Sequence, residues 1–491
     1  MISKGSIRTI FVKSHPGRQA ASLPELDVPE SETGEIHDLL REGPIGLPEV
    51  SEGQCMRHYV TLSCRNYHIE QGIYPLGSCT MKYNPKVHEN LARTHGLCCL
   101  HPELPDGQVQ GTLEIMHRLE SMLCEITGFQ ATSLHPAAGA QGELTGLLVI
   151  RGLLEDLGET QRDEVLMPDS AHGTNPASAV LAGMKVINVS SDQRGLVDLE
   201  DLRSKAGPKT AALMLTNPNT LGLFESDILE ITEIVHAAGG RVYMDGANMN
   251  ALMGIARPGD MGFDVCHLNL HKTFSTPHGG GGPGSGPVAC TAELAPYLPH
   301  PRVVADQDGY RLVNSGGLSF GSLLAFAGNV GVCLKAFAYI LSLGPRGIRQ
   351  VSENAVLNAN YLKALLAGHF EIPFDNGPCM HEFVASGSGQ KEQGASTADM
   401  AKRLLDYGYH APTVYFPLIV REALMIEPTE TESLESLESF AQAMISIAEE
   451  VESKPHLVTD APVSTPVLRL DEVRAVKELC IVEPWIRQTE E

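Results

Sequence analysis

Lys272 is the residue whose surroundings in the sequence most favour chemistry. It follows an apolar run, Val265 to Leu270, that predicts a buried strand, and it precedes a glycine-rich segment from Gly279 to Gly286. Partial removal from water at a strand end lowers the pKa of a lysine amine, and the neutral amine is nucleophilic toward an aldehyde. A His-Lys pair alone more often marks a solvated surface lysine, so this interpretation needs further residues.

Asp245 ends a second predicted strand, Arg241 to Met244. A buried carboxylate there can pair with the pyridinium nitrogen of pyridoxal 5'-phosphate (PLP), an aldehyde cofactor, and keep that nitrogen protonated. Ligands of parallel sheets bind beyond the carboxyl ends of the strands, where Asp245, His271 and Lys272 all fall. Asp245 could equally be a turn or helix-capping residue, so its pairing with Lys272 is only moderately specific.

Two further segments are suited to the same cofactor. In Pro168 to Ala177, His172 could stack on the cofactor ring, although a capping turn with an incidental histidine explains it too. Gly139, Ala140 and Gln141 stand at a predicted helix start, where backbone N–H groups and the helix dipole favour a phosphate. A plain tight turn is the alternative interpretation of this second segment.

Polar residues in Thr216 to Gly222 add a third set of contacts. Asn217 and Thr220 could bind the phenolic oxygen of the cofactor or a substrate, although Pro218 alone would explain a loop. No metal site is predicted. His267 and His271 are four apart, but on a strand their Cα atoms would lie about 13 Å from each other. The glycine-rich segment is interrupted by prolines, which favours a loop over the active site rather than a dinucleotide fingerprint.

The elements that must position these residues alternate along the chain. Continuous apolar strands separated by helices predict an α/β fold in which a parallel sheet is covered on both faces. The pattern of predicted helices and strands changes near Gly344, which predicts a smaller C-terminal α+β domain. We therefore expect an N-terminal arm and interface segment over 1–109, a large PLP-binding domain over 110–343 and a small domain over 344–491. The predicted strands are Glu164–Met167, Lys185–Val189, Ala211–Leu215, Arg241–Met244, Val265–Leu270 and Thr413–Ile419, and the predicted helices include Gln110–Thr127, Leu144–Leu154, Ser226–Ala238, Ser396–Gly408 and Leu434–Val451.

Composition excludes several classes of function. The chain has 491 residues, with 36 Lys and Arg against 60 Asp and Glu, for a formal charge of −24. Such a surface repels phosphate backbones, so neither nucleic acid nor a membrane is an expected partner. The 11 cysteines include no C-x-x-C pair, which favours free thiols in a reducing compartment. With no apolar run long enough to span a bilayer, the cytoplasm is the expected location.

Six segments together resemble the glycine decarboxylase P-protein family of the glycine cleavage system, and the likeness runs through most of the chain from about residue 55. The first and the last of these segments are highly specific to that family. They are Tyr74 to Pro85, His135 to Glu143, Asp169 to Ser178, Thr216 to Gly222, Met244 to Met253 and Leu268 to Gly282.

The resemblance implies a fold-type I PLP-dependent enzyme that decarboxylates glycine and transfers the aminomethyl group to the lipoyl arm of H-protein. Lys272 would be the Schiff-base lysine, Asp245 the pyridinium partner and His172 the ring-stacking residue. The remaining cofactor contacts would come from Gly139, Ala140, Gln141, Asn217, Thr220 and His271, the substrate channel or partner interface from Ser78 and Cys79, and phosphate donors across an interface from Ser319 and Ser322.

The chain is about half as long as the single-chain members of the family, and it contains one His-Lys-Thr-Phe segment. The resemblance therefore implies subunit 2, with one PLP, a subunit 1 partner and a dimer of heterodimers. Two alternatives remain open at the level of sequence. One is another fold-type I enzyme, such as an aminotransferase or an amino-acid decarboxylase. The other is a non-catalytic scaffold, against which Lys272 and Asp245 argue.

Overall fold

The computed structural model describes residues 9–29, 37–43, 45–278 and 284–479. The chain divides into two compact units. One comprises residues 72–461, and the other joins the residues up to 71 to those from 462 onward. All the residues predicted to do chemistry belong to the 72–461 unit, so this larger unit is the one that positions the site.

A seven-stranded mixed sheet forms the centre of the larger unit, with the spatial order first, seventh, sixth, fifth, fourth, second, third. The five strands from the second to the sixth run parallel, and the seventh is antiparallel to both of its neighbours. In chain order the strands are β1 (Ala131–Ser133), β2 (Glu164–Pro168), β3 (Lys185–Val189), β4 (Thr210–Thr216), β5 (Arg241–Gly246), β6 (Val265–Leu268) and β7 (Val288–Cys290).

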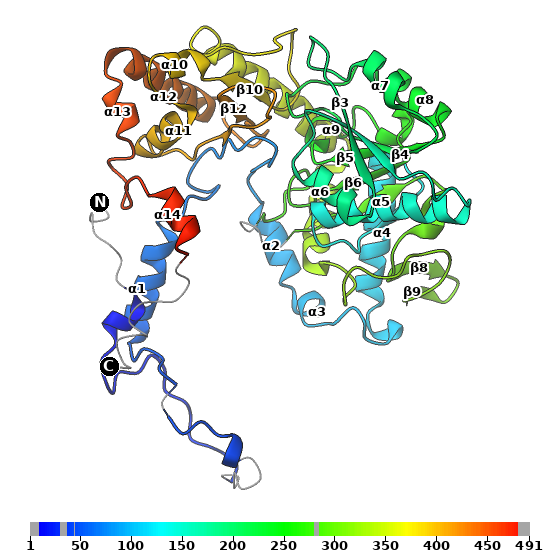
Figure 1. The fold of residues 1–491 in the computed structure, drawn as a ribbon. Coiled ribbons are helices and arrows are strands. Elements are labelled where there is room, and N and C mark those ends of the chain that lie inside the picture. Colours follow the sequence, from blue (N-terminus) through cyan, green and yellow to red (C-terminus); the bar gives the residue numbers. More distant parts are fainter. Residues whose placement is uncertain (1–8, 30–36, 44, 279–283, 480–491) are drawn as a thin grey trace. The chain divides into compact units, whose positions relative to one another are not determined.

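Helices cover both faces of this sheet (Figure 1). Successive strand residues supply opposite cores, because side chains alternate along a strand. On β2, Leu166 packs on one face while Val165 and Met167 pack on the other. The predicted α/β fold class is confirmed. The first face is covered by α4 (Gln110–Thr127), α7 (Leu199–Lys205), α8 (Ile228–Ala237) and α9 (Val330–Leu366), and the second by α5 (Gly139–Asp156) and α6 (Thr174–Leu181).

A smaller antiparallel sheet and its helices form the C-terminal α+β part of the same unit. Its strands are β10 (Phe383–Ser386), β11 (Thr413–Val414) and β12 (Ala423–Ile426), in the order β10-β12-β11. A separate core lies beneath it, with Phe383, Leu404 and Phe440 fully buried. The helices here are α10 (Ser388–Glu392), α11 (Thr397–Asp406), α12 (Leu434–Ser453) and α13 (His456–Thr459). The remaining α-helices and strands of the larger unit are α2 (Lys86–Ala92), α3 (His95–Cys98), β8 (Arg302–Asp306) and β9 (Gly309–Val313).

The long helix α9 is interrupted at Gly344, where the predicted small domain begins. Gly344 has a φ of +60° inside it and Pro345 follows, so the two halves of α9 are separated by a kink. Both sheets nevertheless belong to one compact unit. The predicted domain boundaries after residues 109 and 343 therefore stay a prediction.

Three sequence expectations are wrong in detail. The strand expected over Thr413–Ile419 stops at Val414, because Tyr415 takes a positive φ and Pro417 has no N–H to donate. The expected cap Ser226 does not cap α8, which begins at Ile228 behind Asp227 without a side-chain capping bond. The strand that precedes Lys272 ends at Leu268 rather than Leu270.

The other unit contains α1 (Glu52–Ser63) and α14 (Glu472–Lys477). The extended arm expected up to about residue 60 is therefore wrong over α1, which begins with a capping box between Ser51 and Gln54. Several large apolar side chains of the arm are exposed, including Leu23, Leu26 and Val28. Across the described parts of the chain, no helix is long and apolar enough to cross a membrane.

Candidate active site

Lys272 lies in the turn that follows β6 and is only 9% exposed. Its Nζ donates a hydrogen bond of 2.6 Å to the carbonyl oxygen of Ser78. Ser78 and Thr80 both have positive φ angles, of 64° and 45°, which non-glycine residues keep only where the surroundings enforce them. The structure thus brings the predicted Ser78-Cys79 loop and the predicted lysine together.

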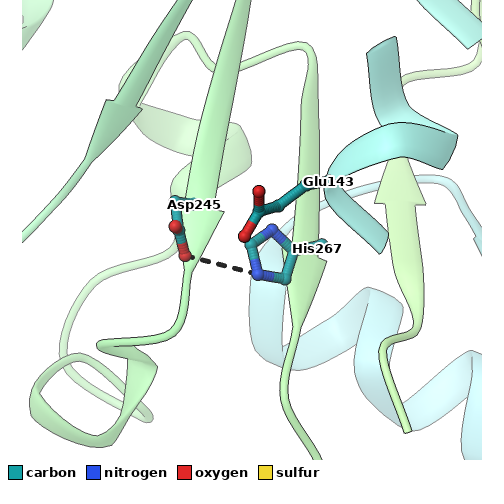
Figure 2. A group of neighbouring side chains, drawn as sticks. All are labelled: Glu143, Asp245 and His267. Carbon is teal, nitrogen blue, oxygen red and sulfur yellow. Dashed lines mark ion pairs between the residues drawn. The ribbon is translucent and has the colours of Figure 1, made fainter. Parts of the chain in front are cut away.

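Asp245 lies at the end of β5 and is 2% exposed (Figure 2). Its carboxylate accepts hydrogen bonds from Asn175 Nδ2 at 3.0 Å and from the Ala247 N–H at 2.9 Å, and it lies 3.3 Å from His267 Nε2. Burial opposes ionisation, but His267 and the two hydrogen bonds outweigh it and hold the pKa of Asp245 below its usual value. The Lys272 amine acts in the same direction, so it lies close enough to the Asp245 carboxylate to favour its charged form.

His267 links Asp245 to the sheet behind it. Its Nε2 lies 3.3 Å from an oxygen of the Asp245 carboxylate, and its Nδ1 lies 2.8 Å from the Tyr243 hydroxyl. Figure 2 shows Glu143 of α5 beside this pair. Glu143 accepts from the hydroxyls of Thr174 and Ser178, at 2.6 and 2.8 Å. The contacts with Asn175, Ala247 and His267 fix the orientation of Asp245.

Sequence reasoning missed this network, although a signal was present. Parallel pairing places His267 of β6 directly beside Asp245 of β5. In the sequence alone, His267 stands out only through its spacing from His271, which does not suit a shared metal ion. Glu143, Asp245 and His267 do lie close enough together to hold an ion, so the absence of a metal site stays a prediction.

His172 lies between β2 and α6, beyond the carboxyl end of its strand, as Asp245 lies at the carboxyl end of β5. Its Nδ1 lies 2.8 Å from the Thr174 hydroxyl, and its ring meets Phe416 edge-on with centroids 5.6 Å apart. Burial lowers the pKa of His172, with Asp245 opposing and Lys272 adding to the effect. A neutral imidazole beside Asp245 and Lys272 suits the predicted ring-stacking role, which stays a prediction.

The predicted phosphate segment is the first turn of α5. Gly139 follows the extended Ala138, so the first N–H groups of the helix have no partner within it. The Gln141 side chain accepts from the Ala137 N–H at 2.8 Å, which leaves Ala140 and the backbone as the groups open to a phosphate. A Cβ on Gly139 would meet Asn269 Nδ2 at 2.5 Å, so any larger residue here would displace the Asn269 side chain.

Several buried polar atoms at the carboxyl ends of the central strands have no hydrogen-bond partner among the described residues. They are Thr216 Oγ1, Asn217 Nδ2, Asn248 Oδ1 and Asn269 Oδ1. Buried polar atoms in folded proteins nearly always have partners, so these unmet atoms indicate a polar ligand. With the amine of Lys272 and the charged Asp245, they fit a phosphorylated pyridine aldehyde.

The remaining predicted cofactor contacts are placed as follows. The Thr220 hydroxyl donates to the Ser170 carbonyl at 2.6 Å, and Asn217 accepts from the Glu225 N–H. His271 packs against His278, and burial, helped by Lys272, lowers the pKa of His271 to about 3.

The two serines predicted as phosphate donors bond to groups of their own surroundings. Ser322 Oγ lies 3.3 Å from His135 Nε2, and Ser319 bonds within its own turn. Their role across an interface stays a prediction. Most of the predicted glycine-rich loop over the active site, residues 279–283 of the segment from Gly279 to Gly286, lies outside the described residues.

Cys79 sits between the two strained residues of the Ser78 loop. Burial raises the pKa of its thiol, while Lys272 opposes that effect. A thiol rather than a thiolate is therefore present near neutral pH, which argues against a nucleophilic role. Its predicted place in a substrate channel stays a prediction.

Comparison with protein families decides the relationship of the chain. Residues 23–311 match the family model described as glycine cleavage system P-protein, and residues 351–464 match that of the glycine dehydrogenase C-terminal domain. The chain belongs to the glycine cleavage system P-protein family. The resemblance noted in the six sequence segments is thereby confirmed.

Relatives in this family match over nearly their whole length. A protein of Halalkalibacterium halodurans named probable glycine dehydrogenase (decarboxylating) subunit 2 is 58% identical over 471 residues, which cover 96% of each chain. A protein of the same name from Desulforamulus reducens is 56% identical over 474 residues, covering 96% of this chain and 98% of that one.

Solved structures show the same fold. A glycine decarboxylase (P-protein) of the glycine cleavage system, in inhibitor-bound form, superposes with a TM-score of 0.70 at 21% identity, covering 84% of this chain and 94% of that one. A glutamate decarboxylase of Lactobacillus brevis superposes with a TM-score of 0.65 at 13% identity, covering 86% and 97%. The predicted fold-type I architecture, with a large sheet domain and a smaller C-terminal part, is confirmed.

Proposed function

We propose that the chain is the lysine-bearing subunit of a PLP-dependent glycine decarboxylase, and that it transfers the aminomethyl group of glycine to the lipoyl arm of H-protein. The observation that carries this proposal is the buried Asp245 carboxylate, which lies beside His267 and is favoured in its charged form by Lys272. Membership of the P-protein family and the names of the relatives support the same reaction.

The residues of the chain have separate tasks in this reaction. When bound, PLP supplies an electron sink for the electron pair released as CO₂ leaves glycine. Lys272 would hold the cofactor through its amine, and Asp245 would keep the proton on the ring nitrogen. The first turn of α5 at Gly139 and Ala140 would bind the phosphate, and His172 would cover one ring face.

The proposed partners follow from the family. They are a subunit 1 of similar size, paired in a dimer of heterodimers, and a lipoylated H-protein, with glycine as substrate. The expected location is the cytoplasm. The ten cysteines among the described residues are all free thiols, which agrees with a reducing compartment.

The test is the exchange of radiolabelled bicarbonate into glycine by the chain with its partner subunit. We expect exchange that depends on lipoylated H-protein and disappears in Lys272→Ala. The matched control is Lys185→Ala, which removes an exposed lysine paired with Asp163 on a remote strand. Exchange that ignores lipoylation would indicate a different PLP decarboxylase, and full exchange in Lys272→Ala would refute the proposal.

A further inference from the structure

Two glutamates meet behind the Ser78 loop because of strand register. Phe383 of β10 pairs with Ile426 of β12, so Glu382 and Glu427, one position further out, lie opposite each other where the two strands end. Like charges in such cross-strand positions repel. Both side chains are almost completely buried, at 0% and 1% exposure, so water does not screen this repulsion.

Both carboxyl groups bond the loop that touches Lys272. Glu382 accepts from the Ser78 N–H at 2.7 Å, and Glu427 accepts from the Thr80 N–H at 2.8 Å and from the Thr80 hydroxyl. The carbonyl of Ser78 accepts from Lys272 Nζ. The two acids thus hold both residues of positive φ and, through Ser78, the position of the lysine amine.

The other titratable groups facing the pair are Lys272, His381, Cys79, Cys379 and Glu430. Neither ring nitrogen of the buried His381 has a hydrogen-bond partner among the described residues, and burial lowers its pKa to about 3, so it is neutral. Glu430 is paired with Lys82 at 2.8 Å. Lys272 is therefore the one cation of this group that is left to balance the two acids.

The nearest oxygens of the two carboxyl groups and the nearest His381 nitrogen lie within 4.8 Å of one another. Two buried carboxyl groups this close cannot both ionise easily, because one charge raises the cost of the other. Burial, followed by Glu427, raises the pKa of Glu382 well above its usual value, and burial raises the pKa of Glu427 to about 7.

We propose that Glu382 and Glu427 share one proton and act as a positioning pair, which carries a single negative charge, holds the Ser78–Thr80 turn and sets the charge balance of Lys272. Neither acid touches the reacting atoms. The pair acts through the Ser78 carbonyl and through its charge. The proposal rests on the proposed function, in which Lys272 holds PLP.

Proton sharing predicts that the charge of the pair does not change when only one of the two glutamates is replaced. Either single variant, Glu382→Gln or Glu427→Gln, keeps an acceptor oxygen for the loop and leaves one carboxyl group that can ionise alone. The pair then still carries one negative charge. Only the double variant removes it, and a lost neighbouring anion lowers the pH at which a cationic lysine–cofactor linkage gives up its proton.

The first measurement is a pH titration of the absorption band of the lysine-bound cofactor in the full chain loaded with PLP. We expect both single variants to keep the wild-type midpoint, and the double variant to lower it by about 1 pH unit or more. The matched control is Glu225→Gln, a buried glutamate of the β4–α8 loop that also accepts a backbone N–H. Shifts in each single variant would overturn proton sharing, and a double variant that behaves like the control would overturn the charge role.

A second measurement keeps the two proposals distinguishable. A wild-type chain that forms no lysine–cofactor band contradicts the proposed function. The glutamate pair is then tested by infrared spectroscopy, which separates protonated from ionised carboxyl groups. Near neutral pH we expect, beside the signals of other buried acids such as Glu225, a protonated carboxyl signal that is lost in both single variants. If that signal is absent from the wild type, or if it persists in both single variants, proton sharing is wrong.

Discussion

At the scale of residues, the site depends on a carboxylate that stays charged although it is buried. Asp245 does so because His267 and two hydrogen bonds outweigh the cost of desolvation. We predict that Asp245→Asn keeps the fold and retains PLP but lowers kcat for glycine exchange by about 10²-fold or more, because a charge aimed at the reacting system is lost. The check is kcat and KM measured separately, with Asp163→Asn as a remote control. An unchanged kcat would contradict the role of Asp245.

A second residue-scale prediction concerns Glu225, which lies away from Lys272. Burial raises the pKa of Glu225 to about 7, above its unfolded value, so between the two values the native state holds a proton that the unfolded state has released. Stability therefore falls as pH rises through this window. We predict that Glu225→Gln gains on the order of 3 kcal/mol over the wild type between pH 4.5 and 8. Urea unfolding at both pH values measures the gain, and a difference independent of pH would count against it.

Some of the site residues were predictable from the sequence. Lys272 and Asp245 could be placed because both follow recognisable apolar strands. Glu382 and Glu427 could not, because their meeting depends on the register of two strands separated by α10 and α11. Nothing local in the sequence encodes that register.

At the scale of elements, helix α5 must approach the sheet closely to bring its first turn to the site. A Cβ on Gly146 would clash with the ring of Tyr243, whose hydroxyl bonds His267. We predict that Gly146→Ala destabilises the chain by about 1–3 kcal/mol through overpacking and weakens PLP binding. Gly111→Ala in α4 is the control, since nothing lies within 4 Å of the position that its methyl group would take. Equal unfolding midpoints for the two variants would contradict this packing argument.

Element boundaries followed from local signals where such signals existed. The helix Gln110–Thr127 and the strand Lys185–Val189 have the bounds that the sequence predicts, and Gly128 ends that helix in a left-handed conformation. The predicted strand at Thr413 is too long because the positive φ of Tyr415 leaves no mark in the sequence. The short strands β1 and β7 escape sequence prediction, since three residues give no periodicity.

At the scale of the whole molecule, the chain exposes apolar side chains on its N-terminal arm. Leu23 is 91% exposed and Leu26 is 72% exposed. If subunit 1 covers them, replacing both by serine should weaken association by about 10-fold or more, because each buried leucine contributes roughly 1.5–3 kcal/mol. Sedimentation of the mixed subunits measures this, with Ser22→Ala as control. Unchanged association would place the partner surface elsewhere.

The proposed reaction depends above all on Lys272 being the amine that holds the cofactor. Borohydride reduction of the PLP-loaded chain, followed by peptide mass spectrometry, tests this without any partner. We predict one pyridoxyl-labelled peptide, with the label on Lys272. A label on another lysine, or none on a chain that binds PLP, would contradict it.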